Sequence, residues 1–162
     1  MKKIIIALLA VLMVTGCALV DRFTGGSDFD PSGDKLYCVM DSSWDDGSSE
    51  LTAYYSGDEV NFVEVVNRSP QKAEDLDVIL FSAGLATKPL NAIKGFEIEM
   101  KASDDKDFLV TIVRVDYEKI DWEAFDKLWS SYEDSPFTGF TGKERSVSYI
   151  KEKAEADGFS CN

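Results

Sequence analysis

Three consecutive stretches with the periodicity of β-strands constrain the fold of this chain most. Apolar side chains recur at every second position in residues 35–43 and 49–56, and residues 59–67 are rich in Val and Phe. Asp46-Gly47 and Gly57-Asp58 are turn-forming pairs that separate these stretches. Short turns join antiparallel strands, whereas parallel strands need a crossover of a dozen or more residues. The first half of the chain is therefore predicted to be an antiparallel meander.

The second half mixes helices with two further strands. A helix is predicted to start at Ser69-Pro70 and to stop at Gly84, and two strands are predicted at 95–103 and 108–117. A second helix is predicted at 122–133, with Asp121 as its cap. A third helix follows the capping box Thr141–Glu144 and ends at Gly158-Phe159. The order β-β-β-α-β-β-α-α predicts an α+β fold. We expect two to three helices on one face of an antiparallel sheet of about five strands.

The N-terminal segment has the pattern of an export signal. Two lysines precede an unbroken run of 11 apolar residues at 4–14, which is too short for a membrane-spanning helix of roughly 20 residues. Val14-Thr15-Gly16-Cys17 then resembles the lipobox of bacterial lipoproteins. This resemblance implies cleavage between Gly16 and Cys17 and lipid, as diacylglycerol and palmitate, on Cys17. Residues 1–16 are accordingly interpreted as a signal peptide and left out of the fold.

The mature chain is expected to contain one domain behind a tether. Gly25-Gly26-Ser27 and Pro31-Ser32-Gly33 favour flexible or turn conformations, so residues 17–34 are interpreted as the lipidated cysteine and its linker. Residues 35–162 then form a single α+β domain. The lipid would hold it on the extracytoplasmic face of the cytoplasmic membrane. Ala18, which is not an aspartate, would also permit an outer membrane in an enteric-type envelope.

Charge excludes some partners. The chain of 162 residues has a formal net charge of -13, and removal of Lys2 and Lys3 makes it -15. Such a chain repels nucleic-acid phosphates and anionic headgroups, so no nucleic-acid partner and no polybasic membrane contact is expected.

Two cysteines remain once Cys17 is assigned to lipid. Cys38 and Cys161 form an even pair in an exported chain, where disulfides persist, so a bridge between them is expected. The alternatives are two buried free thiols or a reactive cysteine. The chain contains no histidine that could act as the base of a catalytic thiol.

Catalytic and metal sites have only weak sequence support. Ser148 and Lys151 are close in sequence, but a solvated helix face explains them better than a nucleophile–base pair. The 30 acidic residues guarantee chance carboxylate pairs. Residues 45–50 and 104–107 could supply oxygen ligands, yet their spacing does not match a calcium loop and turns explain them. We expect no metal site, no cofactor and no enzymatic activity.

Aromatic residues in loops are the candidates for partner contact. Trp44 lies in a hairpin turn, and Phe137 and Phe140 lie in a loop rich in Gly. Exposed aromatic side chains at such places mark binding surfaces. Phe125 and Trp129 are assigned to the core instead, because they fall on the apolar face of their helix.

Four stretches together resemble the YehR-like small bacterial lipoproteins. They are the lipobox, Tyr55-Ser56-Gly57-Asp58-Glu59-Val60, the run from Val115 through Asp121-Trp122, and the helix that ends Ala156-Asp157-Gly158-Phe159. The resemblance implies an exported, lipid-anchored α+β domain and brings no catalytic residues. The expected function is therefore a non-catalytic envelope domain that binds a protein, a glycan or a small ligand. The alternatives are a structural or envelope-maintenance role and a carboxylate-dependent hydrolase.

Overall fold

A computed structural model describes residues 31–41, 47–129 and 145–162 of the chain. Within these ranges it contains six strands and three helices, with α3 and α4 following the last long strand. The strands are β1 (Asp34–Asp41), β2 (Ser48–Ser56), β3 (Glu59–Pro70), β4 (Phe96–Ala102), β5 (Phe108–Asp116) and β6 (Ser160–Cys161). The helices are α2 (Ala73–Asn91), α3 (Trp122–Trp129) and α4 (Val147–Ala156).

All strands belong to one antiparallel sheet in the order β4-β5-β3-β2-β1-β6. The α+β class is confirmed, and the described sheet has one short strand more than the five expected. That strand, β6, pairs with β1 through Cys38 opposite Cys161 and Val39 opposite Ser160. Two residues are too few to produce a recognisable alternation, which is why the sequence does not reveal β6.

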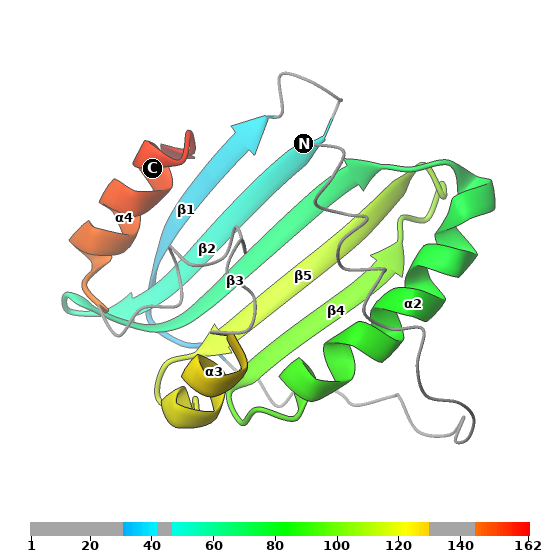
Figure 1. The fold of residues 1–162 in the computed structure, drawn as a ribbon. Helices are drawn as coiled ribbons and strands as arrows, with labels where there is room; N and C mark the ends of the chain where they lie inside the picture. Colours follow the sequence, from blue (N-terminus) through cyan, green and yellow to red (C-terminus); the bar gives the residue numbers. More distant parts are fainter. Residues whose placement is uncertain (1–30, 42–46, 130–144) are drawn as a thin grey trace.

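The core lies between one face of the sheet and the helices. Leu36, Leu51, Ile98 and other alternate strand residues are buried there, as the period-two pattern predicts. Phe125 of α3 and Ile150 of α4 complete the same cluster. Figure 1 shows α2 along the β4 edge and α4 beside β1 at the opposite edge of the sheet.

Helix α2 starts later and ends later than the sequence predicts. Ser69 and Pro70 do not start the helix, because they extend β3 and pair with Leu109 and Phe108 of β5. The helix also continues through Gly84 and contains Pro89. A proline in the last turn removes one backbone hydrogen bond, whereas an interior position disrupts the helix.

Burial explains why α2 continues past its proline. Leu90 and Ile93 are buried in the core cluster, so the end of the helix is fixed by packing against the sheet. Asn91 adds two hydrogen bonds to the backbone of Ile98 on β4, one donated by its amide (2.9 Å) and one accepted by its carbonyl oxygen (2.6 Å).

Helix α4 begins at a different cap and ends as predicted. Its N-cap is Ser146, whose hydroxyl accepts a hydrogen bond from the Tyr149 backbone N–H. The proposed capping box at 141–144 lies outside the described residues. At the C-terminal end Gly158 has φ +98°, and the Phe159 N–H bonds to the Ala154 carbonyl at 2.9 Å. This is the Schellman arrangement, and it directs the chain from α4 into β6.

Candidate functional site

Cys38 and Cys161 are joined by a disulfide, as expected from the sequence. They lie directly opposite each other on β1 and β6, with their Cα atoms 4.0 Å apart, the close spacing of a non-hydrogen-bonded antiparallel pair. The Asn162 N–H bonds to the Tyr37 carbonyl next to the bridge (3.0 Å). Neither sulfur is therefore a free thiol in this structure.

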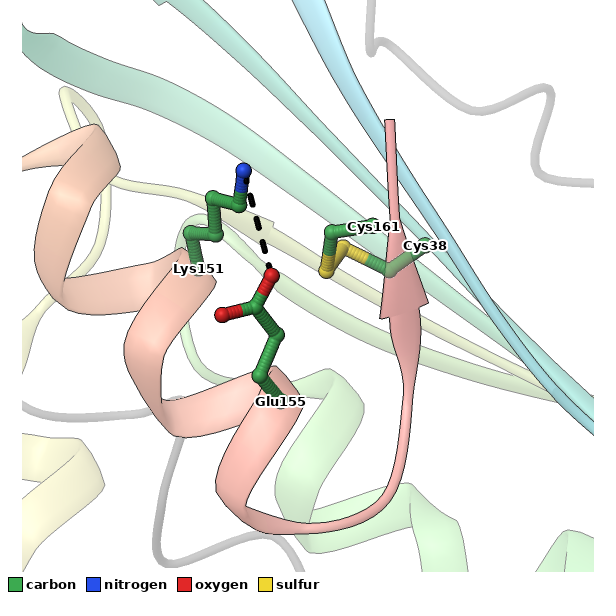
Figure 2. Close-up of a disulfide and its surroundings, with 4 residues drawn as sticks. All are labelled: Cys38, Lys151, Glu155 and Cys161. Carbon is green, nitrogen blue, oxygen red and sulfur yellow. Dashed lines mark ion pairs between the residues drawn. A yellow bond between two sulfur atoms is a disulfide. The ribbon is translucent and has the colours of Figure 1, made fainter.

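The bridge is shielded on the core side of the sheet. Cys38 is fully buried, and Figure 2 shows the two sulfurs beside α4. On α4, Lys151 and Glu155 form an ion pair at 3.8 Å. Both side chains are about half exposed, so this pair belongs to the solvated face of the helix, as the sequence indicates for Lys151.

A shallow polar depression lies at the end of the sheet where the described chain begins. Its two halves share Asn61 and Glu118. One half is completed by Ser56, Glu59, Val60 and Arg145, and the other by Pro31, Ser32, Phe62, Asp116 and Lys119.

Asn61 is the unusual group in this depression. Its amide nitrogen donates to the Ser32 carbonyl at 3.2 Å, while its buried carbonyl oxygen has no hydrogen-bond donor among the described residues. Most buried acceptors in folded proteins have a donor, so a water molecule or a polar ligand group is expected here.

Four of the charged side chains that line the depression form two ion pairs. Lys119 contacts Asp116 at 2.8 Å, and Arg145 contacts Glu59 and donates to the Tyr117 carbonyl at 3.2 Å. The Asp116 carboxylate also accepts from the backbone N–H groups of Glu118 and Lys119. These contacts fix the backbone turn after β5.

The face of the sheet opposite the core cluster carries an ion-pair network centred on Arg114. From β5, Arg114 donates to Glu64 on β3 (2.8 Å) and to Glu97 and Glu99 on β4 (3.0 and 3.2 Å). Burial by itself lowers the pKa of Arg114, but the hydrogen bonds that it donates to Glu64 and Glu97, and the charges of these carboxylates, raise it above its usual value. Lys101 contacts Glu99 at 3.1 Å, so the network extends to the end of β4.

The turn at 104–107 is explained by its own hydrogen bonds. Asp105 accepts hydrogen bonds from the Ser103 hydroxyl and the Asp107 backbone N–H, and these lower the pKa of its carboxyl. Lys106 takes a left-handed conformation with φ 62°. Within the described ranges, no three Cys, Asp or Glu side chains are grouped so that they could hold a metal ion.

Helix α2 exposes an apolar surface that sequence analysis misses. Val78, Phe81 and Leu85 are 66%, 71% and 42% exposed. They follow one another at i, i+3 and i+7, so they form one stripe along the helix. We call these three residues the outer stripe.

The residues singled out for lipidation and partner contact lie outside the described part of the chain. Gly16 and Cys17 precede it, and Trp44, Phe137 and Phe140 fall in its two gaps. Their roles stay predictions. Of the helices described, none has the length and apolar character that crossing a membrane requires.

Comparison with known proteins locates the lipid site and matches the fold. Residues 1–18 match the prokaryotic membrane lipoprotein lipid attachment site, which supports a lipid-anchored envelope protein. No curated protein matches the chain.

Two solved structures share the fold. A protein from Streptococcus pneumoniae TIGR4 is 13% identical and has a TM-score of 0.55, with 92% of this chain and 99% of that chain covered. Escherichia coli YehR is 18% identical and has a TM-score of 0.54, with 82% and 93% covered. The expected resemblance to YehR-like lipoproteins is thus confirmed in the fold and in the lipid attachment site.

Proposed function

We propose that this chain is a lipoprotein of the extracytoplasmic face of the cell envelope, and that its domain binds a partner rather than catalyses a reaction. The lipid attachment site at residues 1–18 carries the anchoring part of the proposal. The Cys38–Cys161 disulfide supports the extracytoplasmic face, because structural disulfides form and persist in oxidising compartments.

The outer stripe of α2 supports the binding role. Phe81 leaves 71% of its surface in water, and Val78 and Leu85 extend the apolar surface along the helix. Burial of such side chains against a partner is favourable by about 25 cal/mol per Å² of apolar area. A contiguous apolar patch with charged residues at its borders is typical of an interaction site.

The anchor is tested by replacement of its acceptor residue. Cys17→Ser should abolish incorporation of radiolabelled fatty acid and release the protein from the membrane fraction. In wild-type protein trapped by acid quenching, Cys38 and Cys161 should resist alkylation until a reductant is added. Continued labelling of the Cys17→Ser variant would refute the lipid site, and free thiols at both other positions would argue against the extracytoplasmic face.

The binding role is tested by protection of the helix in native membranes. Phe81→Cys should react slowly with a maleimide in intact membranes and quickly after purification in detergent. Val39→Cys is the matched control, since Val39 is 38% exposed on the sheet face away from the helices. Equal reaction rates for Phe81→Cys in both settings would contradict a bound partner at α2.

A further inference from the structure

The outer stripe of α2 is bordered by the acidic residues Glu74 and Asp77 towards its N-terminal end and by the basic residue Lys88 towards its C-terminal end. Glu74 lies seven positions before Phe81, and Lys88 lies seven positions after it. At 100° per residue, Glu74, Lys88 and the stripe all fall within about 80° of the helix circumference. One exposed side of the helix therefore has acidic residues at one end, three apolar side chains with Phe81 at their centre, and a basic residue at the other end.

This surface of α2 is complementary to the same surface of a second copy when the two helices run antiparallel. In an antiparallel pair of helices with a two-fold axis at Phe81, each Phe81 meets its own copy, and Val78 meets Gly84 and the neighbouring Leu85 of the second copy. Glu74 lies opposite Lys88 of the second copy at both ends. Symmetric pairs of this kind, in which the same patch serves both subunits, are the commonest form of protein oligomer.

Neither Glu74 nor Lys88 is used within the described fold. Both Glu74 and Lys88 are exposed, and neither forms an ion pair with another described residue. They are 14 positions apart, about 21 Å along the helix axis, so they cannot reach each other within one copy. Contact between them requires two molecules.

Gly84 is a second, independent feature of this face. A glycine inside a helix costs about 1 kcal/mol relative to alanine. Gly84 has an ordinary helical φ, and a Cβ built on it would meet nothing within 4 Å outside its own helix backbone, so the fold of one copy does not require glycine here. Next to Phe81, the missing side chain lowers the helix surface and lets another helix approach closely.

We propose that α2 docks against α2 of a second copy of this chain, antiparallel and about a two-fold axis at Phe81. This inference rests on the binding role proposed for α2 and names its partner. The 15 residues from Cys17 to Pro31 reach at most about 50 Å, so lipid-anchored copies are held in one thin layer at high effective concentration. A small interface, which is weak in dilute solution, is populated under that confinement.

The partner is identified by a photoreactive aromatic residue at the centre of the stripe. In native membranes, full-length lipidated chain that carries benzoylphenylalanine at position 81 should give a covalent dimer of itself on illumination. The same residue at position 37 is the control, because Tyr37 is exposed on β1. A cross-link from position 81 to lipid or to another protein would overturn self-association and leave the binding role of α2 intact. No cross-link from position 81 would overturn both.

The orientation is tested by exchange of the border charges. Glu74→Lys and Lys88→Glu should each reduce the dimer yield about three- to tenfold, because each places like charges opposite each other at both ends. The double variant Glu74→Lys/Lys88→Glu should restore the yield. Failure of the double variant to recover, with its thermal melting unchanged, would overturn the antiparallel pairing.

Discussion

Asn91 pairs with Ile98 as an extra strand residue would. Its side-chain amide satisfies both backbone groups of Ile98 at the outer edge of β4, where no further strand is present in the described sheet. Helix α2 is thereby joined to the strand that follows it, and the exposed edge of the sheet is partly covered. Edges covered in this way are less available for pairing with other chains.

Asn91→Ala is expected to lower the free energy of unfolding by about 1–3 kcal/mol, because two hydrogen bonds are lost and the Ile98 backbone groups lose their partners. Urea denaturation followed by circular dichroism measures the change. Asn67→Ala is the control, since Asn67 accepts a single bond from the Ser49 hydroxyl. A loss no larger than that of the control would show that water replaces Asn91 at this edge.

Cys161→Ser is expected to lower the free energy of unfolding by about 4–5 kcal/mol in the chain-entropy account, because the bridge joins residues 123 positions apart. Thermal melting without reductant measures the loss. Wild-type protein in dithiothreitol provides the reference and should melt near the variant. If the variant melted at the same temperature as the oxidised wild type, the disulfide would add no stability and the prediction would be wrong.

Arg114→Met is expected to destabilise the domain by about 1–3 kcal/mol at pH 7, because Glu64, Glu97 and Glu99 lose their shared donor. Arg68→Met, which removes an exposed pair at 4.0 Å, should cost less than about 1 kcal/mol.

The effect of Arg114→Met should also depend on pH. Burial raises the pKa of Glu99, but hydrogen bonds from Lys101 and Arg114 outweigh it and lower that pKa below the ordinary 4.5. The folded state then binds fewer protons than the unfolded state, so this stabilisation is present above pH 4.5 and is lost as the pH falls through the folded value. The gap between wild type and variant should shrink from pH 7 to pH 4 in urea denaturation, and a constant gap would contradict the assignment.

Tyr117→Phe is expected to alter stability at alkaline pH. Burial, with a smaller contribution from Tyr149, raises the pKa of the Tyr117 phenol above its ordinary 10.0. Above pH 10 the unfolded state loses a proton that the folded state keeps, so stability falls as the pH rises. The variant keeps the ring that packs 5.6 Å from Trp122 and should reduce this slope by up to about 1.4 kcal/mol per pH unit. Identical slopes for both proteins between pH 10 and 11 would refute the prediction.

Local patterns in the sequence correctly predict the buried face of an element when apolar residues occupy only one of its faces. Leu36, Cys38, Leu51 and Ala53 are buried on the face that alternation assigns to them. The end of α4 is also predicted correctly, because Gly158 and Phe159 follow the pattern of a left-handed cap with an apolar contact.

The same patterns fail for α2. Residues 78–87 contain no charged side chain, so nearly every face of the helix is apolar and periodicity does not select the buried one. The structure buries Leu76 and exposes Ala73, although their spacing of three residues places both on one side of the helix. The outer stripe is found only once the position of α2 at the sheet edge is known.

For the extracytoplasmic location proposed above, the position of β6 fixes the order of events during export. β1 lies among the first described residues and is held by a bond to residue 161, so the two cysteines cannot meet until almost the whole domain has passed the translocation channel. Until then the outer edge of β1 has no β6 beside it, and the emerging chain presents an open strand to its surroundings. Oxidation of this bridge therefore reports that translocation has reached residue 161, and a stalled chain is recognisable by a reduced Cys38.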